Sequence, residues 1–164
     1  MNSELPRTLK LATVWLLVGL GLFLAVQAWQ HEQARTRFHA GAEAIEIRRS
    51  VDGHYHWPGR LNGQAVDFLV DTGATGTAIP AQLAQALRLA SIGSIESSTA
   101  GGRVVGQIVV ADLALAGGIE IEKLRVVALT GLDEHPLLGM DVLGRLRWQQ
   151  RDGVLRIEAS GPAP

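Results

Sequence analysis

The sequence predicts an all-β domain that follows one N-terminal transmembrane helix. Residues 11–29 read LATVWLLVGLGLFLAVQAW, an uncharged apolar run long enough to cross a hydrocarbon core of roughly 30 Å. From residue 44 onward, short strand patterns with a period of two alternate with turn signals about every ten residues. The 19 glycines, many of them paired or following Asn or Asp, are typical of a β-chain with tight turns. These observations favour a closed or sandwiched β-domain with one or two short helices.

The apolar run has two interpretations, which differ in whether it stays attached to the chain. A cleavable secretory signal is the alternative to an anchor, because Val26-Gln27-Ala28 is an acceptable small-residue cleavage site. The run is longer than the usual signal core of about 7–15 residues, so we favour a retained anchor. Arg7 and Lys10 precede it while Arg35 and Arg37 follow it, which leaves the positive-inside rule nearly balanced. A very short N-terminal tail is easiest to leave inside, and we expect the rest of the chain to be exported.

Composition excludes several classes of function. The net charge is −1, which gives no broad basic surface for nucleic acid. The chain has no cysteine, which rules out disulfides, thiol nucleophiles and cysteine metal sites.

His54 and His56 would share one face of a strand, but no third ligand accompanies them at a suitable spacing. We therefore expect surface histidines, no metal and no cofactor.

Asn or Asp followed by Gly predicts a tight hairpin, because both residues accept a positive φ. Such pairs occur at Asp52-Gly53, Asn62-Gly63 and Asp152-Gly153. Glycine pairs at 101–102 and 117–118 predict further turns. We expect strands from residue 44, where Ile alternates with charged residues, and then at 54–61, 65–70, 94–99, 104–115, 119–129, 137–139, 147–150 and 154–158.

Two short helices are expected within this β-domain. Pro80 begins the clearer one, PAQLAQALRL, which places Leu83, Ala86 and Leu87 on one face. The other is expected over residues 140–146. These assignments divide the chain into an N-terminal tail (1–10), a transmembrane anchor (11–29), a linker (30–43), a β-domain (44–158) and a C-terminal tail (159–164).

The stretch FLVDTGATGTAIP, residues 68–80, ends an apolar strand on the carboxylate of Asp71. A buried carboxylate is costly unless it is paired or hydrogen-bonded, so Asp71 is either a turn residue or a reactive group. Asp-Thr-Gly is also a good loop sequence, and chance gives it in a chain of this length about one time in thirty. The context favours catalysis, because a second apolar element, Leu137-Leu138-Gly139, leads into a short helix near the C-terminus and a glycine-tipped hairpin lies between.

The stretches FLVDTGAT and LLGMDVLGRL resemble the retropepsin-like, single-domain aspartic proteases, especially their bacterial membrane-anchored members. The resemblance covers about residues 44–158 and implies an acid-protease β-barrel that hydrolyses peptide bonds. It implies that Asp71 is catalytic and that Thr72 holds the loop to its twin across a dimer. It also implies that Gly73 donates its N–H to the Asp71 carboxylate, and Ala74 occupies a position where the family carries small residues.

The same resemblance implies a flap and a packing element. The hairpin 97–106 would close over an extended peptide. At its tip lie Thr99, Ala100, Gly101 and Gly102. Packed behind the Asp71 loop, and setting its position, would be Leu137, Leu138 and Gly139.

The single Asp-Thr-Gly predicts the number of subunits in an active enzyme. Two carboxylates about 3 Å apart share one proton. The ionised member then takes a proton from water while the protonated one polarises the scissile carbonyl. Because the chain carries one copy, we expect a two-fold homodimer with Asp71 of each subunit beside the axis. The expected partners are a second copy of the chain, a protein or peptide substrate and the membrane, with no nucleic acid.

Two alternatives stay open. Asp141 is the rival for the second carboxylate, but no Thr-Gly follows it, and the start of a helix favours a carboxylate for electrostatic reasons alone. A non-catalytic anchored β-domain that binds peptides or a partner protein through the same groove is the rival function, although a pure binder has no need of a carboxylate there. The favoured interpretation predicts a single-pass protein of the bacterial inner membrane with its catalytic domain in the periplasm.

Overall fold

The computed structural model describes residues 7–33, 37–39, 44–99, 102–132 and 135–158. The chain divides into two units, residues 1–35 and 36–164. The first unit contains helix α1 (Arg7–Gln33), and the second contains all of the strands and two short helices.

Helix α1 is apolar on every side over most of its length. Its stretch Thr13–Gln30 has a mean hydropathy of 1.5, and none of it is buried. Trp15, Leu16 and Phe23 are all more than half exposed. By length and composition this helix is able to cross a membrane, and an N-terminal signal sequence would share both properties.

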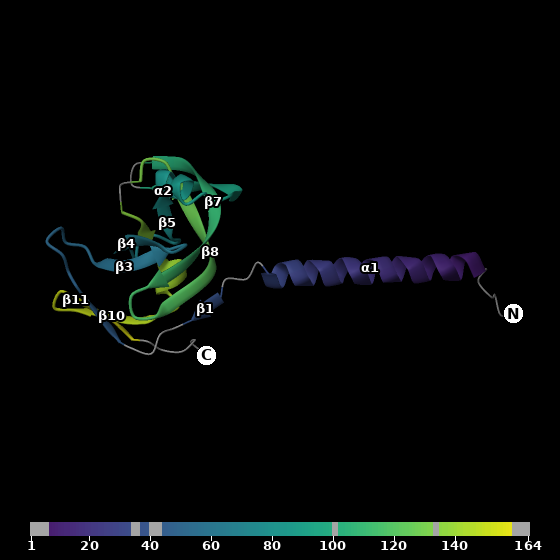
Figure 1. Cartoon of the computed structure of the whole chain (residues 1–164), viewed down its shortest axis with the longest axis horizontal. Helices are drawn as coiled ribbons and strands as arrows, with labels where there is room; N and C mark the ends of the chain where they lie inside the picture. The colour runs from purple at the N-terminus through teal and green to yellow at the C-terminus, as the bar shows by residue number, and fades with distance from the viewer. Residues whose placement is uncertain (1–6, 34–36, 40–43, 100–101, 133–134, 159–164) are drawn as a thin grey trace. The chain divides into compact units, whose positions relative to one another are not determined.

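The second unit is a β-barrel (Figure 1). Six of its strands form a ring in the order β8-β5-β9-β4-β3-β7, and the ring closes because β7 also pairs with β8. Strands β1 and β6 extend the ring on β8 and β7, and β10, β11 and β2 form a separate three-stranded sheet. The strands are β1 (Arg37–His39), β2 (Ile45–Arg48), β3 (His56–Leu61), β4 (Gln64–Val70), β5 (Ala78–Pro80), β6 (Ser91–Thr99), β7 (Gly102–Leu115), β8 (Ile119–Leu129), β9 (Leu137–Leu138), β10 (Arg147–Arg151) and β11 (Val154–Glu158).

The helices of this unit are α2 (Ala81–Ala86) and α3 (Met140–Leu143). The all-β class with two short helices is therefore confirmed for the described residues. Helix α2 is shorter than the predicted stretch that begins at Pro80, because Arg88 adopts a left-handed φ of 53° and ends it. Figure 1 shows α2 and the β10–β11 hairpin at opposite ends of the β-domain.

Two of the three predicted Asn-Gly and Asp-Gly hairpins are present. Asn62 and Gly63 have φ of 46° and 83°, and they join the paired strands β3 and β4. Asp152 and Gly153 have φ of 51° and 75°, and they join β10 and β11. Positive φ at both central residues is what a type I′ turn requires.

The hairpin predicted at Asp52-Gly53 is absent, because β2 and β3 belong to different sheets. Strand β2 pairs instead with β11, in a register that sets Ile47 opposite Leu155. Both of these side chains are buried. A turn does form at residues 50–53, where the Gly53 N–H donates to the Ser50 carbonyl oxygen at 3.0 Å, but β2 pairs with a distant strand and not with β3.

Part of the predicted linker 30–43 belongs to folded elements. Helix α1 continues to Gln33, and β1 pairs antiparallel with residues 120–122 of β8. Strand β7 pairs with one edge of β8 along most of its length. On the other edge of β8, where β1 lies, β5 pairs only with residues 127–129. Strand β1 therefore covers a backbone edge that would otherwise be left unpaired.

The core fills the inside of the ring. Trp57 of β3 and Phe68 of β4 are directly opposite each other in the register and are fully buried. The Trp57 indole N–H donates to the carbonyl oxygen of Ala116 at 3.0 Å, which satisfies its one polar atom. Because side chains alternate along a strand, the residues on either side of Trp57 and Phe68 face away from the core.

Candidate active site

Asp71 lies at the first position beyond β4, where the strand meets β9 from the C-terminal half of the chain. Val70 is the parallel register partner of Leu138. The Asp71 backbone N–H continues this ladder by donating to the Leu138 carbonyl oxygen at 3.0 Å. Burial of Phe68 and the pairing of β4 with β9 hold this end of the strand, so they place the half-buried Asp71 where β4 ends.

The carboxylate of Asp71 is held from within its own loop. The Gly73 N–H donates to Asp71 Oδ1 at 2.8 Å, and the Ala74 N–H donates to the Asp71 carbonyl oxygen at 3.3 Å. A Cβ added to Gly73 would lie 3.2 Å from Asp71 Oδ1, which is tighter than an ordinary contact. The side chain of Thr72 is exposed.

The loop after Asp71 is bonded to the residues that follow β9. The Met140 N–H donates to the Ala74 carbonyl oxygen at 2.8 Å, and the Asp141 N–H donates to that of Thr75 at 3.1 Å. Gly139 approaches the loop so closely that a Cβ there would lie 2.5 Å from the carbonyl carbon and oxygen of Gly76. The structure thus brings Leu138 and Gly139 together with the Asp71 loop, while Leu137 pairs with Leu69 and Ala78 on either side.

A polar pair behind the loop, the buried Thr77 and the half-buried Asp141, was missed by sequence reasoning. Thr77 is fully buried, and its Oγ1 donates to Asp141 Oδ1 at 2.9 Å. The same Thr77 oxygen lies 3.4 Å from the Gly139 N–H, and Asp141 Oδ1 also accepts from the Val142 N–H at 3.0 Å. A hydroxyl set directly before the apolar pair Ala78-Ile79 was the available signal, because such a group needs a partner when it is buried. Asp141 is thus engaged in holding β5 to the start of α3.

A family model described as "gag-polyprotein putative aspartyl protease" matches residues 57–145, which is more than half of the chain. A crystal structure of a retropepsin-like aspartic protease from Rickettsia conorii matches with a TM-score of 0.55 and 23% sequence identity. That match covers 75% of this chain and 92% of the other. The chain belongs to the retropepsin-like aspartic proteases.

A second solved structure shows the same fold. The EIAV protease complexed with the inhibitor HBY-793 matches this retropepsin-like chain with a TM-score of 0.50 and 18% identity. The match covers 58% of this chain and 89% of the EIAV protein. The search of curated proteins found no match.

The described residues of the stretch 97–106, which was predicted to be a flap, belong to the long hairpin of β6 and β7. Its strands stay paired up to Thr99 and Gly102, and Gly102 has a φ of 112° that suits glycine. The predicted tip residues Ala100 and Gly101 lie outside the described residues. Of the side chains along the hairpin, Ile95 is 43% exposed and Val105 is 72% exposed.

A cavity of about 510 Å³ opens beside α2. Its wall includes Pro80, Gln82, Leu129, Leu132 and His135. Asp71 does not contribute to its lining. The cavity lies next to the loop that leads into β9.

Proposed function

We propose that this chain is an aspartic endopeptidase that is active as a two-fold homodimer, with Asp71 of each subunit as the catalytic carboxylate. The observation that carries the proposal is the placement of Asp71. It directly follows β4, whose Phe68 is fully buried, within the stretch matched by the protease family, and its Oδ1 accepts the Gly73 N–H at 2.8 Å. A hydrogen bond from a backbone N–H to a carboxylate is short and directional, so it holds this oxygen in one orientation.

In the proposed reaction, two Asp71 carboxylates lie close enough to share one proton. The ionised carboxylate takes a proton from a water molecule, and the oxygen of that water attacks the carbonyl carbon of the scissile peptide bond. The protonated carboxylic acid donates its hydrogen bond to the carbonyl oxygen, where negative charge develops. The proton that was taken from the water then passes from its carboxyl group to the leaving nitrogen as the C–N bond breaks. No covalent intermediate with the enzyme forms.

The homodimer follows from the number of carboxylates that this chemistry needs. Asp-Thr-Gly occurs once in the chain, and the carboxylate of Asp141 is engaged with Thr77 behind the loop. A second subunit related by a two-fold axis supplies the missing group. The exposed Thr72 is proposed to hydrogen-bond across that axis, while Ala74 keeps the loop compact.

The β6–β7 hairpin is proposed to cover the substrate, which would lie extended beneath it and add main-chain hydrogen bonds. The exposed apolar side chains of Ile95 and Val105 would then contact substrate side chains or the partner subunit. Helix α1 is proposed to anchor the enzyme in the bacterial inner membrane, with the β-domain in the periplasm. Anchoring raises the local concentration of subunits and so favours the dimer.

Replacing Asp71 by Asn tests the catalytic role. Asp71→Asn keeps an oxygen for the Gly73 N–H but cannot act as a base, so we expect peptide cleavage to fall to background in a library digestion scanned from acidic to neutral pH. Sedimentation and circular dichroism serve as controls for dimerisation and folding. Cleavage by Asp71→Asn at the wild-type rate would disprove the mechanism.

Mixing the two forms of the chain tests the shared site. If each active site needs Asp71 from both subunits, equal amounts of wild type and Asp71→Asn that have exchanged subunits should retain about a quarter of the activity of the same total amount of wild type. A monomeric enzyme would instead retain about half. A strictly monomeric chain at high concentration would favour the rival function, a non-catalytic peptide-binding domain.

A further inference from the structure

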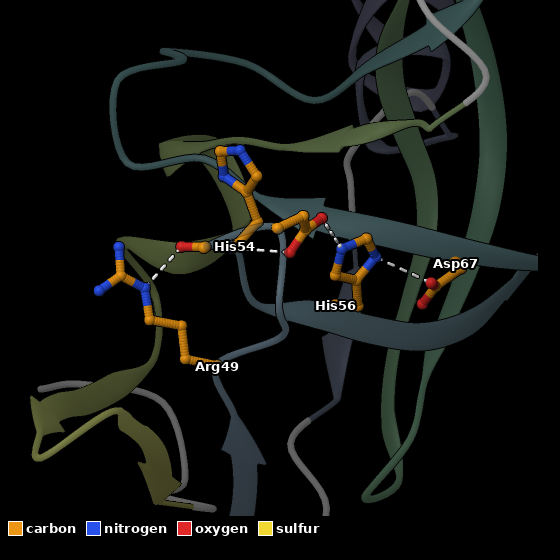
Figure 2. Close-up of polar contacts among 6 residues, drawn as sticks. Arg49, His54, His56 and Asp67 are labelled. Atoms are coloured by element: carbon orange, nitrogen blue, oxygen red, sulfur yellow. Dashed lines mark hydrogen bonds and ion pairs between the residues drawn. The ribbon is translucent and has the colours of Figure 1, made fainter.

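Three potential metal ligands that are far apart in the sequence meet outside the barrel. They are His56 at the start of β3, Asp67 on β4, and His135 in the loop before β9, and their ligand atoms all lie within 4.8 Å of one another. His56 Nδ1 lies 2.9 Å from Asp67 Oδ2 (Figure 2). The edge of one imidazole ring faces the other, with 5.3 Å between the centroids of His56 and His135 and 84° between their planes.

The register of the β3–β4 hairpin explains why two of these side chains meet. Trp57 and Phe68 are opposite each other and fill the core. His56 precedes Trp57 and Asp67 precedes Phe68, so both point to the outer face, where they are diagonal neighbours on adjacent strands. The side chain of His56 is only 19% exposed there, while that of Asp67 is 46% exposed.

The backbone of the third residue is tied to the same hairpin. The Leu69 N–H donates to the carbonyl oxygen of Pro136 at 2.8 Å, directly after His135. Leu69 is the register partner of His56, so this bond holds the His135 end of the loop beside β4. The meeting of the three side chains therefore rests on backbone hydrogen bonds and does not depend on the side chains alone.

A fourth residue, Asp52, occupies the place of an outer-shell partner. Its Oδ2 accepts from His56 Nε2 at 2.7 Å, on the side of the ring away from Asp67. Its Oδ1 accepts from the His54 N–H at 3.0 Å, and Arg49 Nε braces the turn by donating to the Gly53 carbonyl oxygen at 2.7 Å (Figure 2). A metal-binding histidine almost always donates its second ring N–H to a group such as this carboxylate, which fixes the tautomer and the ring orientation.

We propose that His56 Nδ1, Asp67 and His135 bind one divalent transition-metal ion, with Zn²⁺ as the best fit, and that Asp52 orients His56 from the outer shell. Two imidazoles and one carboxylate are a set of ligands that zinc uses when a fourth position is left to water. Zinc bonds of about 2.0–2.2 Å at tetrahedral angles place ligand atoms about 3.3 Å apart. The observed 2.9 Å between His56 Nδ1 and Asp67 Oδ2 therefore needs to widen by only about 0.4 Å.

The charges of the surrounding side chains also favour a divalent cation. Ionised Asp52 and Asp67 carry two negative charges, which balance one divalent cation when both histidines are neutral. The bound ion would join β3, β4 and the loop that leads into β9, the elements that position the Asp71 loop. His135 also lines the cavity beside α2, so the ion would fix one wall of that cavity. Sequence reasoning rejected a metal site here because the additional ligands stand 11 and 79 positions beyond His56.

The test is a zinc titration of the full chain, purified in detergent and stripped of metal. Calorimetry should give one Zn²⁺ per chain, and Co²⁺ should give the strong visible absorption of a four-coordinate site. His56→Ala and His135→Ala should each weaken Zn²⁺ binding at least tenfold, and Asp52→Asn should weaken it by about 10–100-fold. His54→Ala is the matched control, because His54 is an exposed neighbour whose N–H bond to Asp52 survives the substitution. It should bind Zn²⁺ as the wild type does.

Thermal unfolding separates loss of the site from loss of the fold. Without metal, His135→Ala should melt at the wild-type temperature because His135 is exposed, and Zn²⁺ should raise the melting temperature of the wild type more than that of His135→Ala. Absence of saturable Zn²⁺ binding would overturn the proposal, and so would equal weakening by His54→Ala or wild-type binding by His135→Ala. None of these measurements depends on proteolysis, so the outcome is independent of the proposed function.

Discussion

The backbone N–H of Asp71 donates to the carbonyl oxygen of Leu138 at 3.0 Å, which joins the end of β4 to a strand 67 positions further along the chain. Strand β9 lies between β4 and β5, although β4 and β5 are consecutive along the sequence. The loop from Asp71 to Thr77 therefore has to pass around the end of β9. Its position is determined by residues on both sides of that crossing, and substitutions at the crossing should affect the site.

We expect Gly139→Ala to lower the free energy of unfolding by about 1–3 kcal/mol, as overpacking of a tight interior does. The φ of Gly139 is −93°, which any residue adopts, so the effect is purely steric. A Cβ would lie 2.5 Å from backbone atoms of Gly76, and backbone atoms cannot swing aside as a flexible side chain would. Urea unfolding would measure the change, and peptide cleavage should fall with it because the Asp71 loop must move.

Gly76→Ala is the matched control on the other side of the same contact. A Cβ at Gly76 meets nothing within 4 Å. Its stability should therefore stay close to that of the wild type. If both variants lose stability equally, the close approach at Gly139 is not what holds the loop.

The bond between Thr77 and Asp141 predicts coupled losses of stability. Thr77→Val removes the hydroxyl and leaves Asp141 without one of its donors, which should cost about 1–3 kcal/mol. Asp141→Ala should also destabilise the chain, because it leaves the buried Thr77 hydroxyl without its acceptor. The double variant should be less destabilised than the sum of the two by about 0.5–3 kcal/mol, since each single change already breaks the shared bond. Strict additivity in denaturant unfolding would show that the contact contributes nothing.

The sequence predicted the parts of the fold that depend on neighbouring residues. Asn62-Gly63 and Asp152-Gly153 specify their turns through backbone preference alone, and alternation along β7 and β8 specifies which side chains face the core. Asp52-Gly53 also lies in a turn, closed by the Gly53 N–H on the Ser50 carbonyl oxygen, but β2 pairs with β11 and not with β3. A local pattern cannot reveal which distant strand will compete for the same partner.

The contacts of the candidate site are likewise of two kinds, those between neighbouring residues and those between residues far apart in the sequence. The Gly73 N–H reaches Asp71 across two residues, so the motif itself suggests that contact. Thr77 and Asp141 are 64 positions apart, and the pair emerges only from the crossing of β9 between β4 and β5. His56 and His135 belong to this second class as well, because no sequence spacing joins residues from a hairpin and a remote loop.

The pH dependence of stability in the metal-free chain should reflect His56. Its hydrogen bond to Asp52, assisted by Asp67, raises the pKa of His56 above its usual 6.5, since both carboxylates favour the charged imidazolium. The backbone N–H of His54, followed by the His56 side chain, lowers the pKa of Asp52 below its usual 3.8. The stabilisation from His56 is therefore complete below pH 6.5 and disappears as the pH rises through the raised pKa of His56. The stabilisation from Asp52 is present above pH 3.8 and disappears as the pH falls through the lowered pKa of Asp52.

With a chelator present, the free energy of unfolding of the wild type relative to His56→Gln should thus be greatest in mildly acidic solution and should decline as the pH passes from 6 to 9. Urea unfolding at steps of pH would measure this difference for the full chain in detergent. His54→Gln is the control, because the exposed His54 side chain should contribute no such decline. A wild-type advantage over His56→Gln that stays constant across this range would contradict the arrangement of His56 between two carboxylates. A wild-type advantage in unfolding free energy that grows with pH would mean that the folded chain prefers the neutral His56 ring. The two carboxylates, at 2.7 and 2.9 Å from the ring nitrogens, would then not stabilise the imidazolium.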